Sequence, residues 1–268
     1  MQVAKATVRD GTRIAYEVHG RGKNTARIAL VHSLAMDRSF WQDLSGVLEA
    51  HADVLLYDCR GHGQSEKPKG PYRVELFADD LADLLDHVGW SSAVIAGASM
   101  GGCVTLAFAA AYPARARALG LIDTTAGYHA PDKWEERATK ATTAGLQSMI
   151  EFQTSRWFTD EFRAAHPEIV SRSVNTFLAN DPQAYAETCR MLGACDLTAA
   201  LPLMKMPTAI VVGEEDYATP ISMAETLHRG IAGSTLTVLE KARHLTVLEK
   251  PERIAGELQK LIETVSAQ

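Results

Sequence analysis

The sequence has little that is typical of membrane-spanning or nucleic-acid-binding proteins. Its longest apolar runs fall well short of the roughly 20 residues that a transmembrane helix requires. The formal net charge is -6, and lysine and arginine form no block along the chain. Attraction to a nucleic acid or an anionic membrane therefore has no electrostatic support, and we expect a small-molecule ligand.

Cysteine and histidine patterns that would indicate a metal or redox site are also missing. The four cysteines (Cys59, Cys103, Cys189 and Cys195) contain no C-x-x-C pair, and the nine histidines contain no H-E-x-x-H. The N-terminal residues lack the apolar h-region of a secretory signal. We therefore expect reduced thiols, a cytoplasmic protein, and neither a metal ion nor another cofactor.

What the chain does contain is an alternation of strand and helix patterns. Its 268 residues, 46% of them hydrophobic, are enough for one α/β domain with an insertion. Asp10-Gly11 predicts a two-residue hairpin loop between the first two strands. The expected strands are 2–8, 12–19, 27–32, 53–58, 92–98, 118–123, 207–213 and 235–239. Five helices are expected in the core. The first follows Asp37 as its N-cap, and the others lie at 74–88, from Ser99 to about Tyr112, at 220–230 and from Pro251 onward.

The pattern changes between residues 124 and 203, where no continuous apolar run occurs. Amphipathic helical patterns there are interrupted by Pro131, Pro167, Pro182 and Pro202. Repeated β-α units on either side predict a mostly parallel sheet flanked by helices. The sequence thus indicates an α/β core formed by 1–123 and 204–268, with 124–203 inserted as a helical cap.

A nucleophile motif lies at the junction of a strand and a helix. The run Val94-Ile95-Ala96 leads into Gly97-Ala98-Ser99-Met100-Gly101, which reads G-x-S-x-G. A serine on such a sharp turn is exposed at the top of the sheet, and the flanking glycines let the backbone pass. Without that context, the motif is only a glycine-rich turn before a helix.

A serine nucleophile requires a histidine base and a carboxylate that orients it. In this architecture the order along the chain is serine, acid, histidine, each after a strand. Asp216 follows the 207–213 strand and His244 follows the 235–239 strand. Asp123 is an alternative acid. Asp216 could instead belong to a solvated acidic turn or cap a helix, and His244 could be an ordinary surface histidine.

Backbone N–H groups should stabilise the oxyanion that forms during attack. We expect one donor from Met100, which follows the nucleophile, and one from Leu34, with Ser33 as a possible side-chain contributor. Apolar lining of the pocket floor is compatible with both assignments. His32 and His62 are expected to hydrogen-bond within their own loops and to take no part in the chemistry.

Together these residues resemble the α/β-hydrolase fold superfamily. The resemblance covers nearly the whole chain and rests on five motifs in order: Leu30-Val31-His32, Asp58-Cys59-Arg60-Gly61-His62-Gly63-Gln64-Ser65, Gly97-Ala98-Ser99-Met100-Gly101-Gly102, Gly213-Glu214-Glu215-Asp216, and His244. The resemblance implies that Ser99, Asp216 and His244 are the nucleophile, acid and base.

Within the superfamily, the sequence is similar to 3-oxoadipate enol-lactonases. The segments that carry this likeness are Ser33-Leu34-Ala35-Met36-Asp37 with Trp41, Pro68-Lys69-Gly70-Pro71-Tyr72, Trp134-Glu135-Glu136-Arg137 and Arg156-Trp157-Phe158-Thr159. Departures occur at His32, where asparagine is usual, and at Asp123-Thr124-Thr125, where Asn-Thr-Ala is commoner. The resemblance implies a small carboxylated lactone as substrate and a place in aromatic catabolism.

A carboxylated substrate would require a cation in the cap. Trp134 and Arg137 lie three residues apart and therefore share one helix face, so they could form an arginine clamp beside an aromatic wall. An exposed arginine that packs on a tryptophan would have the same spacing. Arg156 and Trp157 are interpreted as structural.

The sequence therefore predicts a serine hydrolase that opens a small enol-lactone or ester through an acyl-enzyme. Two other interpretations remain open. The same triad with a different cap would suit a hydrolase of C–C bonds or of other small esters, and a ligand-binding member of the fold would keep the pocket without turnover. The sequence leaves open whether the chain is a monomer or a homo-oligomer.

Overall fold

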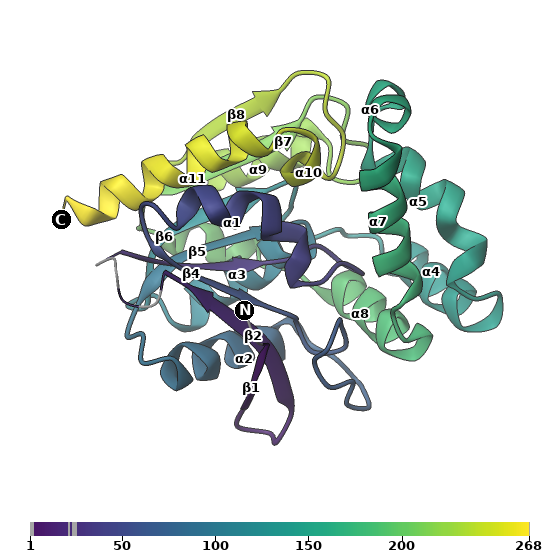
Figure 1. Cartoon of the computed structure of the whole chain (residues 1–268), viewed down its shortest axis with the longest axis horizontal. Coiled ribbons are helices and arrows are strands. Elements are labelled where there is room, and N and C mark those ends of the chain that lie inside the picture. The colour runs from purple at the N-terminus through teal and green to yellow at the C-terminus, as the bar shows by residue number, and fades with distance from the viewer. Residues whose placement is uncertain (1–2, 21, 23–25, 268) are drawn as a thin grey trace.

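An eight-stranded sheet forms the centre of the computed structural model, which describes residues 3–20, 22 and 26–267 (Figure 1). The spatial order is β1-β2-β4-β3-β5-β6-β7-β8. β1 and β2 pair antiparallel, as do β2 and β4, whereas the strands from β4 to β8 in this order pair in parallel. The strands are β1 (Ala4–Thr7), β2 (Arg13–His19), β3 (Arg27–Val31), β4 (Asp53–Tyr57), β5 (Ala93–Ala98), β6 (Ala116–Ile122), β7 (Thr208–Gly213) and β8 (Thr235–Leu239). This arrangement confirms the predicted α/β class.

The N-terminal hairpin differs from its prediction in loop length. Val8 N–H donates to the Thr12 carbonyl at 2.9 Å, and Gly11 N–H donates to the Val8 carbonyl at 2.8 Å, so three residues form the loop. Gly11 has φ +88°, a conformation that suits glycine at the end of such a loop. The first strand begins at Ala4, and residue 2 of the expected strand lies outside the described residues.

Helices cover the two faces of the sheet. In Figure 1, α1 and α11 lie in front of the strands and α3 lies behind them. Asp37 caps the first helical turn as predicted, because its side chain accepts from Ser39 N–H at 2.9 Å. The flanking helices are η1 (Arg38–Trp41), α1 (Gln42–Leu48), α2 (Val74–His87), α3 (Met100–Ala111), α9 (Ile221–Gly230), α10 (Thr246–Glu249) and α11 (Pro251–Ser266). The short helix α10 was not among the expected helices.

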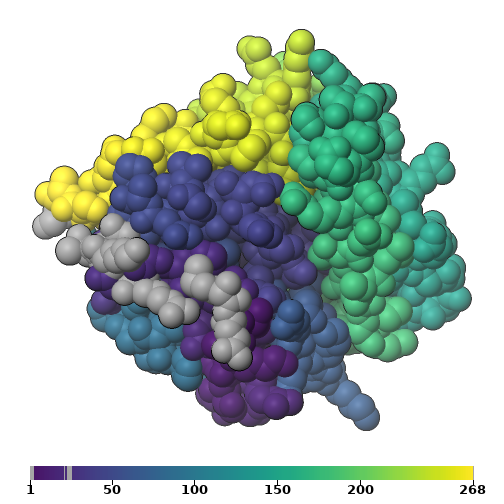
Figure 2. All heavy atoms as spheres, viewed as in Figure 1, coloured from purple at the N-terminus to yellow at the C-terminus, as the bar shows by residue number. Residues whose placement is uncertain are grey.

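The chain between β6 and β7 is helical and lies at one end of the sheet. It forms α4 (Pro131–Thr143), η2 (Leu146–Met149), α5 (Ile150–Trp157), α6 (Asp160–Ala165), α7 (Pro167–Leu178), α8 (Pro182–Ala194) and η3 (Thr198–Leu203). Three of the prolines begin helices rather than interrupt them, since a first-turn residue has no intrahelical use for its N–H. Figure 2 shows this teal and green segment packed as one block against the rest of the molecule.

The segment leaves and rejoins the sheet at neighbouring points. Gly127 and Asp196 form an antiparallel bridge, and Leu197 N–H donates to the Ala126 carbonyl at 2.7 Å. The stretch that enters the helical segment therefore lies beside the stretch that leaves it.

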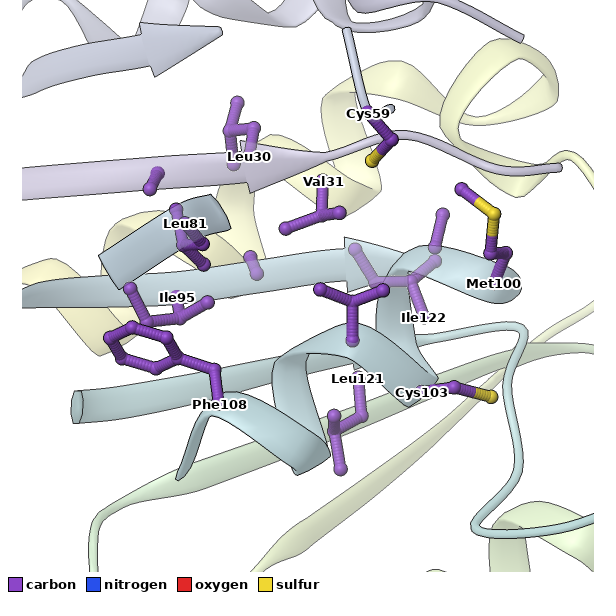
Figure 3. Packing of buried hydrophobic residues seen from close by; sticks show 14 of the residues in the cluster. Leu30, Val31, Cys59, Leu81, Ile95, Met100, Cys103, Phe108, Leu121 and Ile122 are labelled. Atoms are coloured by element: carbon purple, nitrogen blue, oxygen red, sulfur yellow. The ribbon is translucent and has the colours of Figure 1, made fainter. Parts of the chain in front are cut away.

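The hydrophobic core lies between the sheet and its helices. Figure 3 shows Ile95 and Leu121 of the sheet against Phe108 of α3, with Met100 and Cys103 at the far end of the same layer. All five side chains are fully buried. In the part of the chain that the structure describes, no helix combines the length and apolar character needed to cross a membrane.

Candidate active site

Ser99 stands at the corner between β5 and α3 in a conformation that few side-chain-bearing residues adopt. Its φ and ψ are +54° and -116°. A side chain at Gly97 would overlap the Gly101 carbonyl, and one at Gly101 would overlap the Val31 carbonyl of the neighbouring strand. The two glycines thus let a strained turn pack close to β3, which is the local reason that the serine projects from the end of the sheet.

The structure brings Ser99, Asp216 and His244 together although they are far apart in the sequence. His244 Nε2 lies 2.9 Å from Ser99 Oγ, and His244 Nδ1 lies 2.8 Å from Asp216 Oδ2. All three side chains are buried. The imidazole thus bridges the hydroxyl and the carboxylate, the arrangement in which a serine can lose its proton to a histidine.

Several donors surround the Asp216 carboxylate. The N–H groups of Ala218 and Thr219 donate to Oδ1 at 2.7 and 2.9 Å, and Thr219 Oγ1 donates to Oδ2 at 2.7 Å. Burial opposes ionisation, but the charge of His244 and these hydrogen bonds hold the pKa of Asp216 below its ordinary value. The group is therefore suited to remain a carboxylate beside the imidazole.

Asp123, the alternative acid, makes a different set of contacts. Gly213 N–H donates to Oδ1 at 3.1 Å, and the N–H and hydroxyl of Thr246 donate to Oδ2 at 3.1 and 2.6 Å. Burial and the charge of Asp216 raise the pKa of Asp123 well above its ordinary value. Asp123 therefore connects the ends of β7 and α10, whereas Asp216 contacts the histidine.

The residues expected at the oxyanion hole lie beside Ser99. Met100 is the first residue of α3, while Ser33 and Leu34 line the same cavity as Ser99. Met36 N–H donates to the Ser33 carbonyl at 3.1 Å, which closes a tight turn around Leu34. The role of the Met100 and Leu34 N–H groups as oxyanion donors stays a prediction.

His62 hydrogen-bonds within its own loop, as expected, whereas His32 also accepts a hydrogen bond from the loop that follows β4, which the sequence did not predict. Nδ1 of His32 lies 2.8 Å from the Ser33 carbonyl, and its Nε2 accepts from Cys59 N–H at 2.9 Å. Nδ1 of His62 lies 3.0 Å from the Arg60 carbonyl. Burial, with the neighbouring His32, lowers the pKa of His62 to about 3.

The Ser99 hydroxyl and His244 open into a cavity of about 680 Å³ between the sheet and the helical segment. Its walls combine aromatic, sulfur-containing and charged side chains. The lining residues are Ser33, Leu34, Ser99, Tyr128, Ala130, Lys133, Trp134, Glu136, Arg137, Lys140, Met149, Phe152, Gln153, Arg156, Trp157, Tyr217, Ala218, Pro220, Met223 and His244. A cavity of this size accommodates a small organic substrate with room to spare.

Trp134 and Arg137 share a helix face, as their spacing predicts, and both line the cavity. The guanidinium carbon of Arg137 lies 5.1 Å from the Trp134 ring centre and 5.5 Å from that of Tyr185. Arg137 Nε donates to the Tyr185 hydroxyl at 2.6 Å. The arginine is therefore held between two aromatic rings at the edge of the cavity.

The sequence analysis did not identify Tyr128 as a residue of this cavity. Tyr128 contacts Ser99 through its hydroxyl and packs edge-on against Trp134, with ring centres 4.8 Å apart. Arg156, interpreted as structural, lines the cavity as well. Tyr128 lies in a connecting segment without a motif, so no spacing signal could have identified it. Among the described residues, no group of three or more His, Cys, Asp or Glu side chains could hold a metal ion.

Comparison with known proteins identifies the family of this fold. A family model described as "Alpha/beta hydrolase family" matches residues 28–257. The chain belongs to the alpha/beta hydrolase family. It is 31% identical to 3-oxoadipate enol-lactonase 2 of Acinetobacter baylyi over 237 residues, which cover 88% of each protein.

Solved structures of this family agree closely with the chain. The enol-lactonase of Burkholderia xenovorans LB400 superposes with a TM-score of 0.94 at 32% identity, covering 97% of this chain and all of that one. A thermophilic esterase from Thermogutta terrifontis, solved with malate bound, gives 0.91 at 29% identity and 99% coverage of both. The predicted resemblance to enol-lactonases is confirmed, and the relatives support an alpha/beta hydrolase that acts on esters or lactones.

Proposed function

We propose that this alpha/beta hydrolase opens a small carboxylated enol-lactone or ester through an acyl-enzyme, as a 3-oxoadipate enol-lactonase does. The observation that carries the proposal is the hydrogen-bonded series from Asp216 through His244 to Ser99, which ends in a cavity that also contains Arg137. The series provides a nucleophile and its base, while the arginine provides a cation for the substrate.

In the first half of the proposed reaction, Ser99 Oγ attacks the lactone or ester carbonyl as its proton passes to His244 Nε2. Asp216 holds the imidazole in the required orientation and stabilises its positive charge. The backbone N–H groups of Met100 and Leu34 donate to the oxyanion. His244 then returns the proton to the departing oxygen, which leaves an ester between the acyl group and Ser99.

In the second half, His244 removes a proton from water, and the water oxygen attacks the acyl carbon. The bond to Ser99 Oγ breaks, and Oγ regains a proton from His244. The product is a carboxylic acid, which ionises at neutral pH. No cofactor takes part in this scheme.

Arg137 is the proposed partner of the carboxylate that the substrate already carries. In the described part of the chain its hydrogen-bond partner is a neutral phenol, and no carboxylate forms an ion pair with it. A guanidinium held between aromatic rings is well suited to bind a planar carboxylate. The enol-lactonase relatives, and the similar esterase that binds malate, support a carboxylate-bearing ligand.

Residues 124–203 would act as a cap over the site, with 1–123 and 204–268 as the core. Twelve of the cavity residues come from this segment, among them Tyr128, Trp134 and Arg156. Substrate choice would therefore depend on the cap, while Ser99 and His244 belong to the core. Ser33 would contact the substrate from the core side.

Other activities of the same fold are tested by product analysis. Cleavage of a C–C bond or of a different small ester would use the same three residues, and a non-catalytic receptor would bind without releasing product. The cytoplasmic location and a role in aromatic catabolism stay predictions, which cell fractionation and growth on aromatic compounds would test.

The nucleophile is tested by Ser99→Ala with an activated ester such as p-nitrophenyl acetate. Turnover should fall by at least about 10³-fold, while the thermal unfolding midpoint stays close to that of the unaltered protein. Activity retained in this variant would refute the assignment of Ser99.

The carboxylate site is tested by Arg137→Ala with a carboxylated enol-lactone and a neutral ester of similar size. We expect KM to rise about tenfold or more for the lactone and to change little for the neutral ester, because only the lactone loses an ion pair. Equal effects on both substrates would contradict the role of Arg137.

A further inference from the structure

A second arginine, Arg156, lines the same cavity as Arg137 and Ser99. Arg156 is in the last turn of α5, and its guanidinium Nη2 donates to the Tyr217 carbonyl at 2.9 Å. Its guanidinium carbon lies 5.1 Å from the ring centre of Phe152. The backbone carbonyl of Arg156 accepts from His244 N–H at 3.4 Å. Arg156 thus contacts the residue that follows Asp216 as well as the proposed base.

The charges around Arg156 are unbalanced. Burial and the positive charge of Arg137 lower the pKa of Arg156, and Asp216 compensates only in part. In the described residues, no carboxylate forms an ion pair with either guanidinium. Lys133, Lys140 and Glu136 also line the cavity, so cations outnumber anions there. Two neighbouring cations repel each other, and an anion bound between them removes this cost.

We propose that Arg137 and Arg156 form a two-point site for a dicarboxylate, the product of the reaction. This inference rests on the proposed function. A substrate that carries one carboxylate binds through Arg137. When water cleaves the acyl-enzyme, the acyl carbon gains an oxygen, Ser99 Oγ regains its proton, and the released acid loses a proton to solvent. The product therefore has a second carboxylate, which arises next to the triad, where Arg156 lies.

The consequence is selective product binding. A monocarboxylate engages one guanidinium, whereas a flexible dicarboxylate engages both and neutralises the pair. A charge-assisted hydrogen bond in a partly buried site is expected to strengthen binding by about tenfold or more. Dicarboxylates should therefore inhibit the enzyme, and monocarboxylates of equal length should inhibit it far less.

The test uses hydrolysis of neutral p-nitrophenyl acetate, inhibited by adipate or by hexanoate at constant ionic strength. For the unaltered protein, we expect the inhibition constant of adipate to be about tenfold lower than that of hexanoate. Arg156→Ala should raise the constant for adipate to near that for hexanoate and leave the constant for hexanoate within about twofold. Arg156→Lys should restore part of the preference.

Arg172→Ala is the matched control, because this exposed arginine pairs with Asp43 outside the cavity and should leave both constants unchanged. Equal inhibition by adipate and hexanoate in the unaltered protein would overturn the proposal. So would an Arg156→Ala variant that hydrolyses the neutral ester more slowly but keeps its preference for adipate, since Arg156 would then only support the Tyr217 segment.

Failure of the proposed function would give a different result. If no ester or lactone is hydrolysed, calorimetric titration of the protein with adipate and hexanoate still measures the two-point site. Preferential binding of adipate that Arg156→Ala removes would support the site independently of turnover, and no preference would reject it.

Discussion

At the scale of single residues, the segment from Ile122 to Thr124 contacts all three loops of the candidate active site. Ser99 N–H donates to the Ile122 carbonyl at 2.9 Å, and Thr124 Oγ1 donates to the Ser99 carbonyl at 2.6 Å. Between them, the Asp123 carboxylate accepts from Gly213, three residues before Asp216, and from Thr246, two residues after His244. Asp123 does not contact His244, but its hydrogen bonds fix the loops that carry Asp216 and His244 relative to each other.

The first residue-scale prediction concerns this contact. In Asp123→Asn, one carboxylate oxygen becomes an NH₂ group that faces an N–H donor, so the hydrogen bonds to Gly213 or Thr246 are lost. We expect kcat to fall by up to about 10²-fold with little change in KM, because displacement of reacting groups slows chemistry more than binding. Steady-state kinetics on a neutral ester measure both parameters.

The control for general destabilisation is Asp80→Asn. Asp80 is a buried carboxylate paired with Arg60 and is not part of the cavity. The Asp80→Asn substitution should lower the unfolding midpoint without lowering kcat of the folded protein. If the two variants have the same kcat, Asp123 has no positioning role.

At the scale of elements, the junction of β5 and α3 depends on how closely α3 approaches β3. β3 pairs with β5 so that Val31 is opposite Gly97, and Gly101 then packs directly against the Val31 carbonyl. Backbone cannot move aside as a flexible side chain can. The G-x-S-x-G spacing is therefore a packing requirement between one helix and two strands, in addition to a turn requirement.

This packing predicts opposite outcomes for two glycine-to-alanine changes in helices. Gly101→Ala adds a methyl group that overlaps backbone, and we expect it to destabilise the fold by about 1–3 kcal/mol and to reduce activity. Gly256→Ala in α11 meets no atom within 4 Å and should stabilise the fold by up to about 1 kcal/mol through helix propensity. Urea denaturation measures both, and a stable Gly101→Ala variant would contradict the packing explanation.

At the scale of the whole molecule, buried histidines couple folding to pH. His32 and His62 are fully buried, and their rings lie edge to face with centres 5.1 Å apart. Burial lowers the pKa of both, that of His62 to about 3. Two imidazoles packed together in the core cannot easily become charged, so the folded protein keeps them neutral.

The sign of the pH dependence follows from this depression. Between its ordinary pKa of 6.5 and about 3, His62 binds a proton in the unfolded chain but not in the folded protein. The contribution of neutral His62 to the free energy of unfolding is therefore complete above about pH 6.5. Below that pH it is lost at about 1.4 kcal/mol per pH unit. Urea denaturation measures the free energy of unfolding between pH 7 and pH 5. In His62→Gln this free energy should fall less steeply with decreasing pH, because about one proton fewer binds on unfolding. Equal slopes would contradict the prediction.

Much of the fold and part of the site could be predicted from local patterns. Strand and helix positions follow from apolar runs and caps such as Asp37, and Ser99 follows from the glycines around it. The three-residue loop after Val8 was missed because Asp10-Gly11 is compatible with two loop lengths and the strand register selects one. The sequence did not show that Arg156 lines the cavity, because residue spacing indicates a helix face and does not indicate what that face packs against.

The sequence by itself determined the order of strands, helices and candidate catalytic residues, because periodicity and turn chemistry are properties of neighbours in the chain. Since parallel strands end at one edge of a sheet, that order also predicts that Ser99, Asp216 and His244 lie near one another. Only the tertiary structure decided that Asp216 rather than Asp123 contacts the imidazole, and that Arg137 and Arg156 share a cavity. These contacts join residues separated by many elements, so packing and strand register determine them.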